Sequence, residues 1–191
     1  RMDNNSDKDP SKPLKVGLTF NLKRNVKSDV EDEEAEYDSI DTVYAIKNVL
    51  ESDGCQVILL EATEELPAKL KQDRPDIVFN IAEGIRGRGR EAYVPALLNV
   101  FGIPFTGSDE TTLCIALDKA LTKRLLSTYH VKTPKYQLIS NDITKRKISV
   151  RYPAIVKPNA EGSSKGISDK AIVSNKEELT ELIDTNLRMY K

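Results

Sequence analysis

Short apolar runs alternate with longer amphipathic stretches over the first half of the chain. Three runs rich in Val, Ile, Leu and Phe predict buried strands at residues 14–20, 55–60 and 75–80. Three stretches with apolar residues three and four apart predict helices at residues 39–50, 64–72 and 91–100, the second of them capped by Thr63. This alternation is typical of an α/β fold, in which a parallel sheet carries helices on both faces.

The second half of the chain has shorter apolar segments. We expect a fourth short strand at residues 103–105 and two helices at residues 110–117 and 118–126, the latter restarted by Asp118. Further strands are predicted at residues 133–139, 152–157 and 171–173, the last two as a hairpin. Ser174 and Glu177 have the spacing of a capping box for a last helix that reaches about residue 187.

Composition and charge narrow the class of protein. Of the 191 residues, 39% are apolar and 31% are charged, which is typical of a globular protein with a core. The net charge of −1 provides no basic field for nucleic acid. No apolar run reaches membrane-spanning length and no signal peptide is visible, so we expect a cytoplasmic protein without membrane contact.

Few residues are available for metal or nucleophilic chemistry. His130 is the only histidine, and Cys55 and Cys114 lie far apart, so no His/Cys metal site and no Ser-His-Asp relay is indicated. We expect both cysteines to be small buried residues in a reducing compartment. The long polar turn at residues 21–34 ends in four consecutive acidic residues, which is more typical of a solvated loop than of a metal site.

The stretch with the clearest chemical character is residues 156–166, which read VKPNAEGSSKG. Lys157 ends an apolar strand, and two serines stand between Gly162 and Gly166. Glycine lets a backbone approach a ligand, and free N–H groups, hydroxyls and ammonium groups can cradle phosphate oxygens. A plain surface hairpin remains the alternative reading of such a loop.

Two parts of the chain resemble a known family. Residues 156–166 look like the ATP-binding loop of the D-alanine–D-alanine ligases, which are members of the ATP-grasp superfamily. Residues 102–108 (GIPFTGS) and 117–123 (LDKALTK) are similar to the segment that joins the family's first domain to its ATP-binding domain. The resemblance covers roughly residues 14–191.

This resemblance implies a division of the chain into four parts. They are a flexible tail at residues 1–13, a parallel-sheet pre-ATP-grasp domain at 14–108, linking helices at 109–132, and the small α+β subdomain of an incomplete ATP-grasp unit at 133–191. The family's glycine-rich turn before its first helix is absent here, which indicates a divergent member.

Site residues follow from the same resemblance. The implied ATP-binding residues are Lys119, Lys157, Gly162, Ser163, Ser164 and Gly166. Ser163 would also anchor the substrate region, and Glu36 would bind the ammonium group of the first amino acid, which makes these two the candidate catalytic residues. The turn after the third strand is a possible substrate loop that contains Glu83, Arg90 and Glu91.

The implied activity is the ATP-dependent joining of two amino acids, D-alanine to D-alanine, through an acyl phosphate, in bacterial peptidoglycan precursor synthesis. ATP and Mg²⁺ are the expected cofactors, with no metal ligand in this chain and the Mg²⁺ ligands beyond Lys191. We expect this chain alone to be an inactive fragment, and the protein to pair as a homodimer through its N-terminal domain. A non-catalytic module that binds a nucleotide or a partner, and an ATP-grasp ligase with another substrate, remain as alternatives.

Overall fold

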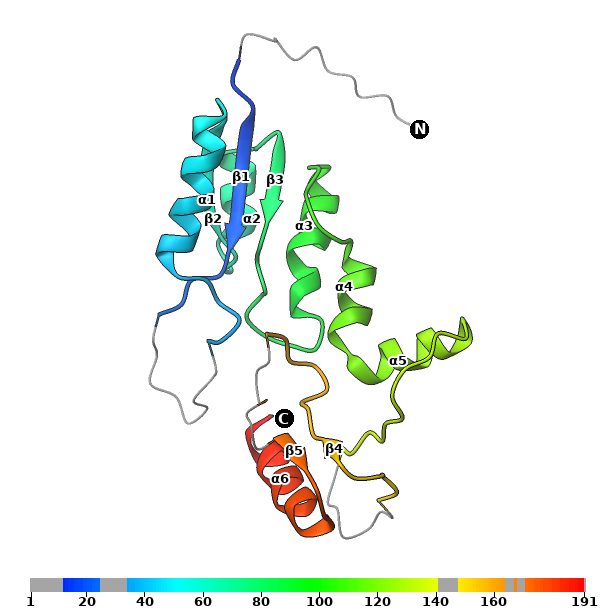
Figure 1. The fold of residues 1–191 in the computed structure, drawn as a ribbon. Coiled ribbons are helices and arrows are strands. Elements are labelled where there is room, and N and C mark those ends of the chain that lie inside the picture. The colour runs from blue at the N-terminus through cyan, green and yellow to red at the C-terminus, as the bar shows by residue number, and fades with distance from the viewer. Residues whose placement is uncertain (1–11, 25–33, 141–147, 164–166, 168–170, 191) are drawn as a thin grey trace. The chain divides into compact units, whose positions relative to one another are not determined.

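The computed structural model describes residues 12–24, 34–140, 148–163, 167 and 171–190 (Figure 1). The chain divides into two compact units, and each is treated by itself. The sheet unit consists of the described residues within 1–23, 37–85 and 93–109. The loop unit consists of those within 24–36, 86–92 and 110–191.

The sheet unit is built on three parallel strands in the order β2-β1-β3. Their bounds are Lys15–Phe20 for β1, Gln56–Glu61 for β2 and Ile77–Asn80 for β3. Val16 of β1 lies opposite Val57 of β2 and Ile77 of β3. The central strand is almost entirely buried, as expected for a strand with helices on both faces.

Helices cover the two faces of this sheet, which confirms the predicted α/β class. Helix α1 (Ile40–Ser52) packs Val43 against Leu18 and Phe20 on one face. Helices α2 (Leu66–Gln72) and α3 (Tyr93–Phe101) pack on the other face. That second core contains Leu60, Leu66, Leu70, Val78, Val94, Leu98 and Ile103.

Two predictions in the sheet unit are corrected. The expected strand at residues 103–105 is a single parallel bridge between Val78 and Phe105. Pro104 in its middle has no N–H to extend a ladder. Helix α2 begins at Leu66 and its N-cap is Glu65, because Thr63 instead closes a turn that precedes the helix, with the N–H of Leu66 donating to its carbonyl.

In its described part, the loop unit contains a 3₁₀ turn, three helices and a short hairpin. The turn η1 (Arg90–Ala92), α4 (Glu110–Leu117) and α5 (Lys119–Thr128) come first. Strands β4 (Ala154–Ile155) and β5 (Ile172–Val173) then pair antiparallel, as predicted for this hairpin. Helix α6 (Lys176–Met189) packs Leu179 and Ile183 against Val173.

The predicted strand at residues 133–139 is wrong, since these residues form no ladder. Pro134 lacks a donor, and the Gln137 side chain accepts the N–H of Ser149 at 3.0 Å where a strand would offer its backbone. The capping box of α6 is also shifted by one residue. Asn175 Oδ1 accepts the N–H of Glu178 at 2.9 Å, and the Glu178 carboxylate accepts the N–H of Ser174 at 2.7 Å. Asn is as good an N-cap as Ser, and the glutamate lies three residues later in either register.

Two smaller observations complete the fold. Cys114 lies on the exposed side of α4 and Cys55 is half-buried, so the expectation of two buried thiols is wrong. Among the described residues, no helix combines the length and the apolar character that a membrane crossing requires.

Candidate functional site

A buried ion pair lies within the loop unit. Nη2 of Arg90 donates to the two carboxylate oxygens of Glu36 at 2.8 and 2.7 Å. The side chains of Arg90 and Glu36 are only 8% and 2% exposed. Each charged group therefore takes the hydrogen bonds from its partner that water would otherwise provide. Arg90 stands in η1, just after a turn in which Gly87 has a φ of 91°, a value that favours glycine.

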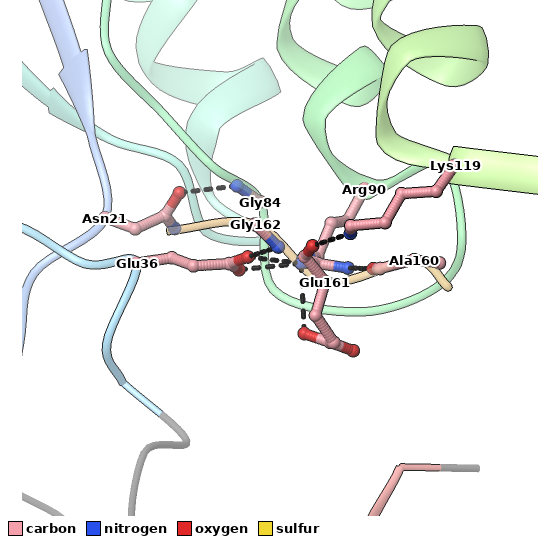
Figure 2. Close-up of polar contacts among 8 residues, drawn as sticks. All are labelled: Asn21, Glu36, Gly84, Arg90, Lys119, Ala160, Glu161 and Gly162. Atoms are coloured by element: carbon pink, nitrogen blue, oxygen red, sulfur yellow. Dashed lines mark hydrogen bonds and ion pairs between the residues drawn. The ribbon is translucent and has the colours of Figure 1, made fainter. Parts of the chain in front are cut away.

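The same guanidinium holds the chain just before the glycine-serine turn (Figure 2). Its Nη1 donates to the carbonyl oxygen of Ala160 at 2.9 Å, and its Nη2 lies 3.2 Å from a carboxylate oxygen of Glu161. The backbone N–H of Gly162 donates to Glu36. Three consecutive loop residues are thus fixed by one ion pair.

Arg90 remains a cation in this setting. Burial acts to lower the pKa of Arg90, but the hydrogen bond and charge of Glu36 raise it, and the charges of Glu161 and Glu91 add to that effect. The net result is a pKa above the ordinary arginine value. The guanidinium therefore stays positively charged in its buried position.

Lys119 is the first residue of α5, and its Nζ donates to the backbone carbonyl of Glu161. Burial lowers the pKa of Lys119, and the positive charge of Lys157 lowers it further. Glu161 and Glu36 oppose this shift without cancelling it. The positive charge of Lys157 thus acts against that of Lys119, and a bound anion would offset this repulsion.

Asp118 positions Lys119 from the start of α5. Its carboxylate caps the helix by accepting the N–H of Leu121 at 2.9 Å, and it also accepts from Arg88. It takes a third hydrogen bond from Nδ2 of Asn159 at 2.8 Å. Burial acts to raise the pKa of Asp118, but these hydrogen bonds hold it below the ordinary value.

Asn159 completes this connection from the loop side. Its Oδ1 accepts the N–H of Ala120 at 2.9 Å, and its backbone carbonyl accepts the N–H of Lys119 at 3.0 Å. The chain just after Lys157 is thereby hydrogen-bonded to the first turn of α5. This contact fixes the segment that follows Lys157, whose own side chain is exposed, against the helix that begins with Lys119.

The residues that are present fit a phosphate group. Lys119 and Lys157 supply positive charge, and the backbone turns sharply at Ser163, where φ is 44° and the residue is exposed. A Cβ at Gly162 would lie 2.8 Å from Oε1 of Glu36, so only glycine fits there without displacing that carboxylate. The two further predicted loop residues, Ser164 and Gly166, lie outside the described residues.

The predicted substrate loop is divided between the units. Arg90 and Glu91 belong to the loop unit, where a Cβ at Gly162 would also lie 3.7 Å from Oε1 of Glu91. Glu83 belongs to the sheet unit, where it is half-buried. Within the described ranges, no group of three or more His, Cys, Asp or Glu side chains is arranged to hold a metal ion.

Several polar residues whose hydrogen bonds shape the two units were not predicted. In the sheet unit, Asn21 is buried directly after β1, where its side chain donates to the carbonyl of Ala62 at 3.1 Å and accepts the N–H of Gly84 at 2.8 Å (Figure 2). A polar residue that follows a buried strand is a signal that could have indicated it. Asn159 and Glu161 had no such signal beyond their place in the loop.

Curated proteins are similar in sequence to this chain. A search of family models found no match. The D-alanine–D-alanine ligase of Aquifex aeolicus is 37% identical over 146 residues, which are 75% of this chain and 48% of that protein. The D-alanine–D-alanine ligase of Xylella fastidiosa is 32% identical over 144 residues, which are 71% of this chain and 47% of that protein.

The chain is a homologue of the D-alanine–D-alanine ligases. The resemblance drawn from the two sequence motifs is therefore confirmed. The chain spans about half the length of the curated relatives that it matches.

Solved structures show the same fold. The D-alanine–D-alanine ligase of Bacillus anthracis superposes with a TM-score of 0.67 at 22% identity, over 92% of this chain and 54% of that one. The enzyme of Helicobacter pylori gives 0.62 at 20% identity, over 92% of this chain and 63% of that one. The chain thus shares the α/β fold of these two D-alanine–D-alanine ligases over about nine tenths of its own length.

Proposed function

We propose that this chain supplies the phosphate-binding loop and part of the first-substrate site of an ATP-dependent carbon–nitrogen ligase. The observation that carries the proposal is that Lys119 donates to the backbone carbonyl of Glu161 while the positive charge of Lys157 acts on Lys119. Relatives named D-alanine–D-alanine ligase, and a Bacillus anthracis structure of that enzyme complexed with ATP, support the nucleotide.

The proposed reaction joins two amino acids, with D-alanine as the first choice for both. A carboxylate oxygen of the first amino acid attacks the γ-phosphorus of ATP, which yields an acyl phosphate and ADP. The amino group of the second then attacks the acyl carbon, loses a proton and displaces inorganic phosphate. Catalysis of such transfer consists mainly of positioning and charge neutralisation, which is the task of lysines and backbone N–H groups.

Five of the predicted site residues have a part in this proposal. Lys119 and Lys157 hold phosphate oxygens, and the turn at Gly162 and Ser163 lies over them. Glu36 meets the ammonium group of the first amino acid. Mg²⁺ would supply neutralisation of phosphate charge when bound. The described residues contain no group of three or more His, Cys, Asp or Glu side chains that could hold it, so no residue of this part of the chain is assigned to the metal.

The wider role follows from the named activity of the relatives. A ligase of this kind would act in the cytoplasm on free amino acids and would serve peptidoglycan precursor synthesis. It needs no nucleic acid and no membrane. A homodimer formed through the N-terminal domain is part of the same proposal.

One assay tests the activity. The full-length gene product is incubated with ATP, Mg²⁺ and D-alanine, and inorganic phosphate and the dipeptide are measured together. We expect phosphate release that requires all three components, with one dipeptide formed per phosphate. A protein that releases no phosphate with D-alanine or with any other amino acid or hydroxy acid is not a ligase.

One observation favours a second function, a nucleotide-binding module without ligation. Both carboxylate oxygens of Glu36 already receive hydrogen bonds from Arg90, and one also receives the N–H of Gly162. An ammonium group must displace or share these donors. ATP binding without phosphate release would support this second function.

A further inference from the structure

The donors of Arg90 are directed at the loop as much as at Glu36. We propose that Arg90 is a positioning residue that sets the place of the phosphate-binding loop, with Glu36 as the counter-ion that holds Arg90 in its conformation. The inference rests on the proposed function in one respect, that the loop at Gly162 and Ser163 binds ATP phosphates. It assigns Arg90 to the nucleotide and not to the amino acid.

The geometry of the guanidinium carries the argument. Nη1 faces the carbonyl of Ala160, while Nη2 faces the carboxylates of Glu36 and Glu161. A planar fork of fixed donors serves acceptors on separate segments at once. A lysine ammonium is a point charge with rotating donors and cannot hold the same directions.

The burial of the Arg90–Glu36 ion pair explains why a change in either residue would shift the phosphate-binding loop. Arg90 and Glu36 are nearly inaccessible, and removal of either one leaves the other as an unpaired buried charge. The Gly162 N–H donates to the same carboxylate, so a displaced Glu36 withdraws a hydrogen bond from the loop. Lys119 bonds to the carbonyl of Glu161, one residue earlier, so displacement of the loop also shifts an acceptor of a phosphate-binding lysine.

The test separates nucleotide binding from amino-acid binding. Arg90→Lys keeps the charge and removes the fork, and Glu36→Gln keeps an acceptor for Gly162 but removes the charge. Arg86→Lys is the matched control, because Arg86 is an exposed arginine four positions earlier in the same segment. The dissociation constant of ATP is measured by titration of the full-length protein without amino acid, and the KM of D-alanine is measured in the ligase assay.

We expect Arg90→Lys and Glu36→Gln each to weaken ATP binding about tenfold, the equivalent of one lost hydrogen bond to a charged group. The KM of D-alanine in Arg90→Lys should stay within about twofold of the wild-type value, well below a tenfold loss of affinity. The double variant Arg90→Lys with Glu36→Gln should lose less affinity than the product of the two single effects, since paired residues couple. Arg86→Lys should bind ATP as the wild type does.

Each outcome decides a different claim. A wild-type protein that does not bind ATP overturns the proposed function and this inference with it. If the wild type binds ATP and Arg90→Lys binds it equally well, or if only the KM of D-alanine rises, the positioning role is wrong and the proposed function stands. Should the Arg90 variants fail to fold, Gly162→Ala tests the same contact with both charges intact, since its Cβ would displace Glu36; ATP affinity equal to the wild type would again overturn the inference.

Discussion

The sheet unit and the loop unit are stabilised by different forces. Leu18, Leu60, Leu70 and Leu98 are fully buried in the sheet unit, where apolar area removed from water is the main source of stability. The buried charged residues Glu36, Arg90 and Asp118 all belong to the loop unit. Apolar packing tolerates the exchange of one apolar side chain for another of similar volume, whereas a buried polar network depends on each partner. The units should therefore respond to different substitutions.

The largest effect is expected in the sheet unit. Leu18→Ala removes a fully buried side chain from the central strand, and unfolding free energy should fall by about 2–5 kcal/mol. Denaturant unfolding of the purified protein, followed by circular dichroism, measures the change. Leu14→Ala is the control, because Leu14 is 44% exposed and should change stability by less than about 0.5 kcal/mol. Equal losses for the two variants would contradict the apolar account of this unit.

A smaller effect is expected at the helix cap of the loop unit. Asp118→Ala removes the N-cap of α5 and the acceptor of Asn159, and should destabilise the protein by about 0.5–2 kcal/mol. Asp118→Asn retains a capping oxygen and should recover most of this loss. The pKa of Asp118 is lowered in the folded protein. Its ionised carboxylate therefore adds to the free energy of unfolding at pH values above the ordinary aspartate pKa, and this stabilisation is lost as pH falls through the lowered pKa. Thermal melts at neutral and acidic pH measure all three effects, and an alanine variant as stable as the wild type would contradict the capping role.

Substitutions at the start of α6 distinguish the predicted N-cap, Ser174, from the observed one, Asn175. Asn175→Ala should cost about 1 kcal/mol, because Asn175 Oδ1 caps the helix. Ser174→Ala should cost less than about 0.5 kcal/mol, because Ser174 contributes its backbone N–H, which alanine keeps. Denaturant midpoints of the two variants give the comparison. A larger loss for Ser174→Ala than for Asn175→Ala would restore the register read from the sequence.

The smallest effect concerns protons taken up with ATP. The pKa of Lys119 is lowered, so part of this lysine is neutral as pH rises toward 10.5, while a bound phosphate favours the charged form. ATP binding at alkaline pH should therefore take up a fraction of a proton, and affinity should fall as pH rises through the lowered pKa. Calorimetry in two buffers of different ionisation enthalpy measures this uptake. The same uptake in Lys119→Met would assign it to another group.

The sequence predicted the sheet unit better than the loop unit for a physical reason. Strands β1 to β3 and helices α1 to α3 repeat apolar residues with a local period, and local periods are visible in one sequence. The contact of Gly162 with Glu36 joins residues 126 positions apart, and no local pattern encodes it. The strand expected at residues 133–139 did not form, although Tyr136 and Leu138 alternate with polar residues as in a strand. Pro134 offers no N–H, and the N–H of Ser149 goes to the Gln137 side chain, neither of which the apolar pattern reveals.

The sequence identified several residues of the candidate site but not the contacts between them. Lys119, Lys157 and Gly162 were named from motifs, and the structure brings them to one loop. Arg90 was placed in a possible substrate loop, but its position against Glu36 depends on burial and direction, which only coordinates reveal. Asn159 emerged only with the structure, because an asparagine after a proline is read as a turn residue.

The central claim is that the loop unit binds the phosphates of ATP, and a titration with two variants of α5 tests it directly. Lys119→Met removes the lysine directed at the loop, and Arg124→Met removes an exposed cation from the same helix. The account predicts that Lys119→Met weakens ATP binding about tenfold or more, while Arg124→Met changes it less than about twofold. Equal affinity of the two variants for ATP would contradict the account.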